Sequence, residues 1–421
     1  MQNFACSFRP KVASAIAVIF VGSMLAAGVY LRGSLPAAWN MLHIPANTPL
    51  FSDTRGITHA IDCVLHGQDP YAVSTFDPWH RLYNYPPMWL LLRYLGVTSA
   101  SSNLMGLLFA LMAISAYLFL LNARTLLTAP IVFLAVTSRC VLLSIERGNT
   151  DQVVFFLLVS GFFLIYRRRP EIRSRLVSAL LILLTILKVY PIAAVTVFLE
   201  RRRWRVATIT VLAAAGALLA TSGRRLAFVF ANTPRELDVS FGAFPFFYAL
   251  SRHTIHLLTP VFVDHRSAAP LAALLLGSAC MLAGILVGST ASRILPPLDS
   301  SQTRGAIAIA CLSIFCSAFV AGSSFDYRLI YLTGGLAWLV EDLDKRQGLR
   351  SLPLALLILL LLWKPFWLSF TGELIDGIVF MTSCLWLGNS LFSRRKDHQP
   401  LDTQRRRKSA AQRQSSMSPI P

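Results

Sequence analysis

Polar and ionisable side chains interrupt or border several long apolar stretches of this sequence, and their types suit one kind of chemistry. A carboxylate can act as general base toward an attacking hydroxyl, and Arg or Lys can neutralise a departing phosphate. Partial exclusion of water strengthens both effects. Such a mixture fits group transfer from a phosphate donor carried on a lipid. The candidate residues are Asp53, Glu146, Arg147, Asn149, Lys188, Tyr190, Asp326 and Arg328.

The composition indicates what kind of molecule must position these residues. Of the 421 residues, 55% are hydrophobic and only 14% are charged, and the mean hydropathy is +0.58. These values lie outside the usage of globular domains. Several windows carry roughly 18 or more nearly uncharged residues, as a bilayer-spanning helix requires. The apolar runs are continuous and lack the alternation of barrel strands. We therefore expect an all-α polytopic membrane protein.

The basic residues fall in short clusters beside apolar stretches. The net charge is +19, and the clusters lie at 167–175, at 200–205 and in the tail 394–421. This pattern indicates cytoplasmic loops and a disordered cytoplasmic tail, not a nucleic-acid partner. The seven cysteines show no disulfide framework or metal-ligand spacing, and the acidic residues lack such spacing too. Neither a metal ion nor another cofactor is expected.

Placing those clusters in the cytoplasm gives a path for the chain. A single membrane domain, 1–393, then has a first outer loop at 32–100, with a re-entrant segment, and a second at 223–268. The candidate residues share the outer side. Arginines of the second loop, among them Arg224 and Arg225, break the charge trend and indicate either an anion site or an error in the path. The expected unbroken spans are 11–31, 101–121, 127–145, 150–166, 206–222, 269–291, 305–322, 327–340, 351–370 and 374–392.

The segment 176–200 needs a different treatment, because basic clusters flank it at both ends. A pair of half-helices broken at "KVYP" puts both clusters on one side, since Tyr190 precedes a proline and is disfavoured in helical geometry. Non-helical backbone at membrane depth requires surrounding protein or a water-filled cavity.

The first outer loop contains an amphipathic pattern in "DTRGITHAIDCVLHG". Ile57 and Ile61 share one face, while Thr58 and Asp62 lie opposite, which is typical of a juxtamembrane helix lying on the membrane surface. "YNYPPMWLLLRYLG" then supplies the short re-entrant segment.

The successive motifs resemble the signatures of glycosyltransferase family 87. They are "FSDTRGITHAIDCVLHGQDPY", "YNYPPMWLLL", "ERGNTDQVVFFLL", "LKVYP" and "SSFDYRLIYL", and they extend from about residue 51 to about residue 332. Family members commonly carry Gly-Gln or Gly-Asn where this chain has Gly148-Asn149, and a Lys-Pro-like break where it has "KVYP".

The resemblance implies a GT-C class protein with about ten to twelve membrane helices. Its members use polyprenyl-phosphate sugars, often mannose, and build on glycan or glycolipid acceptors at the outer face of the plasma membrane. It also implies an inverting transfer with an acidic residue of the first outer loop as base, a position that Asp53 matches.

Most candidates also have a purely structural interpretation that the sequence leaves open. Asp53 suits a cap before a helix, Asn149 a turn, Asp151 a cap on the next helix, and Lys188 an extension to the interface. Ion pairs between Glu146 and Arg147 and between Asp326 and Arg328 need no substrate. The remaining interpretations are solvation for Asp62, a turn for Asp69, and an interfacial belt for Tyr83, Tyr85 and Trp89.

A transporter or flippase of lipid-linked sugars is the alternative function. Transporters tend to place charges on broken helices in two related halves. This sequence has one such break and no visible repeat. The pattern therefore favours transfer.

Overall fold

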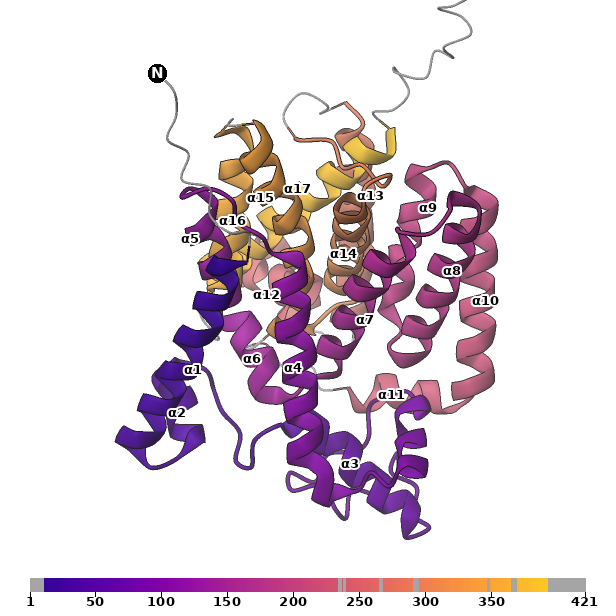
Figure 1. The fold of residues 1–421 in the computed structure, drawn as a ribbon. Coiled ribbons are helices and arrows are strands. Elements are labelled where there is room, and N and C mark those ends of the chain that lie inside the picture. The colour runs from indigo at the N-terminus through magenta and orange to yellow at the C-terminus, as the bar shows by residue number, and fades with distance from the viewer. Residues whose placement is uncertain are drawn as a thin grey trace, which may run out of the picture.

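The computed structural model describes residues 11–233, 237, 240–264, 268–290, 295–346, 349–364 and 369–392. The predicted tail, 394–421, lies outside them. Of the residues that the structure describes, 76% are helical, and their sheet is a short antiparallel pair, β1 (Ser240–Phe241) with β2 (Ser324–Phe325). The protein is therefore all-α, as expected, with most helices side by side and the 33–98 segment across one end (Figure 1).

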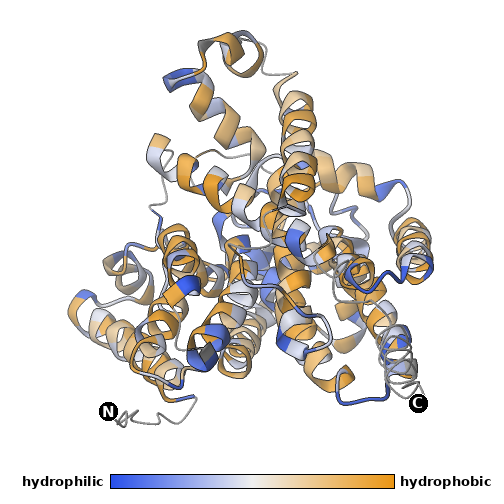
Figure 2. Ribbon diagram, turned by 90° about the horizontal axis from the view of Figure 1, so that it is seen from above, coloured by the Kyte–Doolittle hydropathy of each residue, from blue (hydrophilic) through white to orange (hydrophobic). Residues whose placement is uncertain are grey.

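Seven helices of the described chain are long and apolar enough to cross a membrane. Three shorter apolar helices are α7 (Thr150–Ile165), η3–α9 (Tyr190–Glu200) and η7–α16 (Leu349–Leu362). The outer helices are mainly hydrophobic, and hydrophilic residues also occur near the middle of the bundle (Figure 2). The seven long helices are α1 (Val12–Arg32), η2–α4 (Ser99–Leu120), α5–α6 (Thr128–Arg147), α10 (Trp204–Ser222), α13 (Ala269–Gly288), α14 (Thr303–Val320) and α17 (Phe370–Phe392).

The core of the bundle surrounds α14, whose spanning window is 83% buried. The helix packs against α15 (Leu332–Arg346), α17 and η3 (Tyr190–Val195). Small residues such as Gly334 and Gly335 of α15 let the two backbones approach closely. The buried helix α14 therefore supports β2 and η6 (Asp326–Tyr331), which follow it in the chain.

The predicted break in 176–200 is confirmed. Helix α8 (Pro170–Leu187) ends where Lys188 adopts an extended conformation, and η3 and α9 (Thr196–Glu200) follow. Arg203 donates to Ser174, and Tyr166 and Arg201 both donate to the Ser300 carbonyl. The two basic clusters therefore lie at the same end of the bundle, and the broken hairpin turns back at "KVYP".

The segment 33–98, predicted as the first outer loop, is compact, with α2 (Leu35–Met41), α3 (Ser52–Leu65) and η1 (Pro87–Leu95) as its helices. Helix α3 carries the predicted apolar face, but its polar face is not solvated. Thr58 bonds the Ser102 hydroxyl (2.6 Å), and the buried Asp62 carboxylate accepts from the Ser99 N–H (3.2 Å). The helix is thus tied to the start of α4 (Ser102–Leu120), and the prediction of a solvated Asp62 was wrong.

The segment 223–268 is not a simple outer loop. It begins with α11 (Arg225–Asn232) and continues through β1 into α12 (Ala243–His253), which packs against α13 and α17. The ring of Phe241 stacks on Phe315 of α14, with centroids 5.7 Å apart. The dense apolar run "FGAFPFFYAL" explains the difference, because burying those rings stabilises the segment inside the bundle.

Candidate functional site

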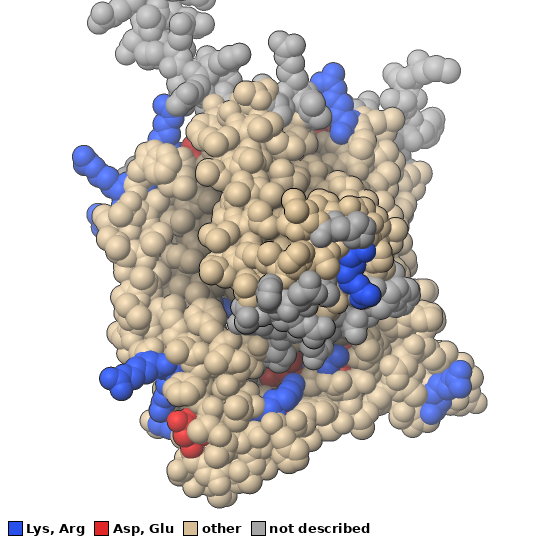
Figure 3. Space-filling view, turned by 180° about the vertical axis from the view of Figure 1, so that it is seen from behind, with Lys and Arg blue, Asp and Glu red and all other residues tan. Residues whose placement is uncertain are grey.

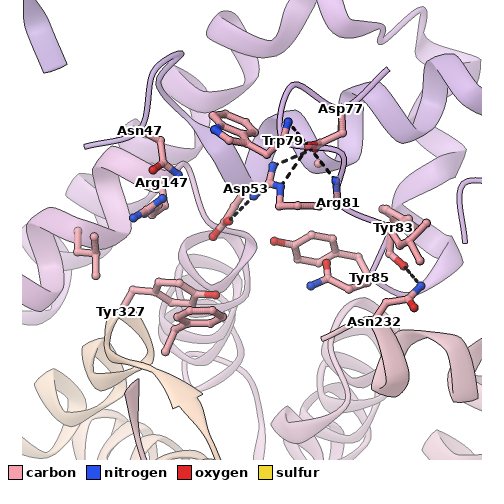
Figure 4. Close-up of a pocket in the computed structure, with 15 residues that line it drawn as sticks. Asn47, Asp53, Asp77, Trp79, Arg81, Tyr83, Tyr85, Arg147, Asn232 and Tyr327 are labelled. Atoms are coloured by element: carbon pink, nitrogen blue, oxygen red, sulfur yellow. Dashed lines mark hydrogen bonds and ion pairs between the residues drawn. The ribbon is translucent and has the colours of Figure 1, made fainter. Parts of the chain in front are cut away.

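A cavity of about 300 Å³ lies between the 33–98 segment and the bundle (Figure 4). Asp53 comes from the first turn of α3, Arg147 from the end of α6 (Arg139–Arg147), and Tyr327 from η6. The Asp53 side chain is 14% exposed. The other lining residues include Asn47, Asp77, Trp79, Arg81, Tyr83, Asn84, Tyr85 and Asn232.

Asp53 does not cap its helix. The N-cap position is Phe51, with no side-chain cap bond, and the helix already begins at Ser52. The Asp53 carboxylate instead accepts from Asn149 Nδ2 through Oδ2, and its Oδ1 lies 4.0 Å from Nη1 of Arg81. The capping interpretation was therefore wrong, and the carboxylate is oriented by two partners at the edge of the cavity.

Arg81 is a site residue that the sequence reasoning missed. Its guanidinium bonds Asp77 (Nη2 to Oδ2, 3.0 Å) and the Ser52 carbonyl (2.7 Å), and it lies over the Trp79 ring. Burial lowers the pKa of Arg81, but the bond to Asp77 and the charges of Asp53 and Asp77 outweigh it and raise that pKa. Arg81 thus remains a cation beside Asp53. The i, i+4 spacing of Asp77 and Arg81 in "DPWHR" was the available signal.

Asn149 joins Asp53 to a second set of charges. Its Oδ1 accepts from the Asp151 N–H (2.7 Å) as the N-cap of α7, and Lys188 Nζ approaches the same oxygen at 3.4 Å. Since the amide oxygen is occupied by donors, its NH₂ group must be the end that faces Asp53. Asn149 is therefore the helix cap that the sequence interpretation assigned to Asp151.

Asp151 lies at the centre of this second set and is fully buried. Its Oδ2 accepts from Lys188 Nζ at 2.7 Å and lies 3.6 Å from Nε of Arg328, and the Tyr331 hydroxyl donates to Oδ1 (3.3 Å). Lys188 is only 7% exposed, so it does not extend to the interface as one interpretation allowed. One carboxylate thus holds two cations, which leaves a positive excess.

These cations line a second cavity of about 210 Å³. Lys188, Tyr190 and Arg328 provide its polar side, and residues such as Phe230 and Ala321 its apolar side. The Tyr190 hydroxyl is buried and has no hydrogen-bond partner within the described chain. Four residues, Asn84, Tyr85, Phe325 and Tyr327, line both cavities, so the two adjoin. Burial raises the pKa of Tyr85 well above its ordinary value, so its hydroxyl stays neutral.

Glu146 and Arg147 form the expected ion pair, at 3.2 Å between Arg147 Nε and Glu146 Oε2. Glu146 is fully buried, accepts from the Asn47 N–H (2.9 Å) and lines neither cavity, so its predicted contact with a substrate has no support. Arg147 lines the first cavity and donates to the Ser52 hydroxyl.

Asp326 does not pair with Arg328. It lies 2.9 Å from Nζ of Lys364, a buried lysine that also bonds Asp376 (2.8 Å) and lies 3.8 Å from Glu373. Asp326 lines neither cavity. Tyr327 and Arg328 of η6 line the cavities, whereas Asp326 of the same helix belongs to a separate buried cluster around Lys364. The predicted place of Asp326 in the site was therefore wrong.

The aromatic residues of the loop do not form an interfacial belt. Tyr83 and Tyr85 are buried and line the first cavity. Trp89 is buried as well and donates from Nε1 to the Leu187 carbonyl (3.0 Å), beside the break at Lys188. These rings join the loop to the broken hairpin and so keep the two cavities next to each other. Asp69, in contrast, is the predicted turn former, since its Oδ1 accepts from the Tyr71 N–H.

Gly148 sets the distance between α3 and α7, and its replacement gives a testable effect. Its φ of 57° is left-handed, and a Cβ would lie 2.4 Å from Thr54 Oγ1. We expect Gly148→Ala to lower the free energy of unfolding by about 1 kcal/mol from the left-handed conformation and by about 1–3 kcal/mol more from the collision. Thermal unfolding in detergent measures the change.

The matched control is Gly33→Ala. Gly33 has a φ of 76° but nothing within 4 Å of a Cβ, so that variant carries the conformational cost alone. Equal losses in the two variants would show that the contact with Thr54 does not constrain the site.

The two adjoining cavities can hold a hydroxyl group that gives its proton to a carboxylate and, next to it, a phosphate. Asp53 offers a carboxylate oxygen to the first cavity, and Lys188 and Arg328 offer positive charge to the second. Among the described residues, no group of three or more His, Cys, Asp or Glu side chains is placed to hold a metal ion. Comparisons of the chain with models of protein families, with curated proteins and with solved structures found no match.

Proposed function

We propose that this chain is a GT-C type membrane glycosyltransferase. It transfers a hexose, mannose by the family resemblance, from a polyprenyl-phosphate donor to a hydroxyl of a glycan or glycolipid acceptor. One observation carries the proposal: the cavity of Asp53 adjoins the cavity of Lys188, Tyr190 and Arg328, and Tyr85 and Tyr327 line both. A base and a phosphate-binding group are needed on two sides of one sugar, and the adjoining cavities offer that arrangement.

The reaction then proceeds as a single displacement. Asp53 accepts the proton of the acceptor hydroxyl while its oxygen attacks the anomeric carbon. The bond from that carbon to the phosphate oxygen breaks with its electron pair on the phosphate, and the configuration inverts. Lys188 and Arg328 neutralise the phosphate, with the free Tyr190 hydroxyl as a further donor. Because phosphate is a good leaving group, no general acid is required.

In this proposal the first outer loop faces the outside of the plasma membrane. The basic clusters at 167–175 and 200–205, which lie together at the opposite end, face the cytoplasm. The shorter apolar helices and α8 complete ten to twelve crossings. The apolar side of the second cavity, with Phe230 and Ala321, receives the first isoprene units of the donor.

A transfer assay tests the proposal. Purified protein is supplied with radiolabelled polyprenyl-phosphate hexose and membrane acceptors, and the products are separated after mild acid hydrolysis of unreacted donor. A new acid-stable glycoside is the expected result. Movement of label across a vesicle membrane without a new glycoside would instead identify a flippase and refute the proposal.

Asn149 is proposed as a positioning residue for Asp53, and Asn149→Asp tests this role. Asp also caps helices well, so the variant keeps the cap, although a second buried carboxylate beside Asp53 should cost some stability. Asn149→Ala, which loses the cap, should lose about 1 kcal/mol. The Asn149→Asp substitution removes the N–H group that donates to Asp53 and places a second negative charge beside the Asp53 carboxylate. Transfer should therefore fall sharply in this variant. Full transfer by a stable Asn149→Asp variant would show that Asn149 acts only as a helix cap.

A further inference from the structure

A third cavity, of about 570 Å³, lies at the rim of the loop end and shares no lining residue with the two cavities described above. It is bounded by the end of α3, by η1, and by the junction of α10 with α11. Arg93, Arg225, Asp69 and Thr221 give it polar groups, and Leu90 and Leu91 give it apolar ones. Nothing in the proposed transfer reaction uses this cavity.

The position of the cavity along the bundle is set by α10. Thr221 belongs to the last turn of this candidate membrane span. Along the same helix Ile209, Leu212 and Leu219 are each more than 60% exposed, as expected of a surface that faces lipid chains. A cavity at the end of such a helix lies at the depth of the lipid headgroups.

The elements around the cavity also present apolar and aromatic side chains outward. In η1, Leu91, Tyr94 and Leu95 are exposed, and in α11 Phe228 is half exposed. Amphipathic rings and leucines beside arginines are typical of segments that lie in the interfacial region of a bilayer. The exposed side chains of the short helices η1 and α11 therefore suit contact with a bilayer on either side of the cavity.

The cavity carries a positive excess. The Arg93 guanidinium donates to the Tyr94 hydroxyl (2.7 Å), and that of Arg225 lies over the Tyr71 ring, 5.6 Å from its centroid. The single lining carboxylate, Asp69, already accepts from the Tyr71 N–H. Basic side chains with an acidic one beside them stand at the lower left of the back view, where α10 and α11 meet (Figure 3). Arg225 is one of the arginines that break the positive-inside trend.

We propose that this cavity binds the phosphate headgroup of an anionic phospholipid of the surrounding bilayer. The phosphodiester oxygens accept hydrogen bonds from Arg93 and Arg225, and the acyl chains lie along the exposed apolar face of α10. Cation–π contact with Tyr71 preorients Arg225 and lowers the entropy lost on binding. The lipid thereby fixes η1 and α11 to the end of α10.

The test measures lipid binding by the intact protein, independently of transfer. Detergent-purified protein is titrated with phosphatidylglycerol or with phosphatidylcholine of the same chains, and bound lipid is counted by native mass spectrometry while thermal unfolding is recorded. We expect tight binding and a rise in unfolding temperature with phosphatidylglycerol only. Each of Arg93→Gln and Arg225→Gln should weaken this binding about fivefold, and the double variant should abolish the selectivity.

Arg224→Gln is the matched control, because it removes the same charge from the adjacent residue, which does not line the cavity. It should retain selective binding. Equal binding of both lipids, or selective binding kept by the double variant, would overturn the proposal. Inorganic phosphate that gives the same stabilisation as phosphatidylglycerol would overturn the lipid assignment, and so would a polyprenyl phosphate that displaces phosphatidylglycerol from the arginines.

Discussion

Asp53→Asn should lose hexose transfer by about two to four orders of magnitude, the usual contribution of a general base. The amide cannot accept the proton of the acceptor hydroxyl at neutral pH. Its size matches that of the carboxylate, so donor binding and membrane insertion should be retained. The initial rate of glycoside formation with saturating polyprenyl-phosphate hexose measures the loss, and binding of the labelled donor serves as the folding control.

Asp299→Asn supplies the matched comparison. Asp299 lies at the opposite end of the bundle, beside Ser300. Its Oδ1 accepts from the Ser301 N–H, a bond that an Asn oxygen preserves, while its Oδ2 accepts from the Ser301 hydroxyl and from Gln302 Nε2, which an NH₂ group cannot replace as acceptor. That variant should transfer at the parental rate. Turnover within a few-fold of the parent in Asp53→Asn would exclude Asp53 as the base, while loss in both variants would point to the assay.

Lys188→Met should destabilise the protein by about 3 kcal/mol. Removing one partner of a buried ion pair leaves the other charge without compensation. Asp151 is fully buried and, among the described residues, would keep only Arg328, at 3.6 Å, as a charged partner. Thermal or denaturant-induced unfolding in a fixed detergent measures the change, and loss of donor binding should accompany it.

The double variant Lys188→Met/Asp151→Asn separates the two roles of Lys188. It removes both charges of the pair and should recover part of the stability, because no uncompensated carboxylate remains, although Arg328 loses its carboxylate partner. Donor binding should stay weak, since the phosphate still lacks the ammonium group. A single variant as stable as the parent would contradict the pairing of Lys188 with Asp151, and full donor binding by the double variant would remove Lys188 from the phosphate site.

The elements that the sequence predicted best are those set by local physical chemistry. Apolar runs form the helices, and the break at Lys188 follows from Tyr190-Pro191 between two basic clusters. The prediction of a simple loop at 223–268 was wrong because the path of the chain was inferred from charge. The stretch "FGAFPFFYAL" is instead held by tertiary packing against α13, α14 and α17. The prediction of a solvated polar face on α3 was wrong for a related reason. Thr58 on that face bonds Ser102, which is distant in sequence.

The candidate site was predicted in part. Asp53, Asn149, Lys188 and Arg328 meet as expected, because each borders an apolar segment at the same end of the bundle. Asp326 was wrongly placed in the site because the direction of its side chain depends on the 3₁₀ conformation of η6, which the spacing of the residues did not predict. Arg81 was missed because "DPWHR" has the composition of an ordinary turn, and its place beside Asp53 arises from the fold of the loop.

The buried cluster around Lys364 has a consequence for how the chain is inserted during synthesis. Asp326, Lys364 and Asp376 are each 4% exposed or less, and Lys364, just after α16 (Leu352–Leu362), pairs with Asp326 of η6 and with Asp376 of α17. Each charge alone is costly in lipid. Segments α15 to α17 should therefore leave the translocation channel together, and a nascent chain that stops before residue 376 should remain bound to the insertion machinery.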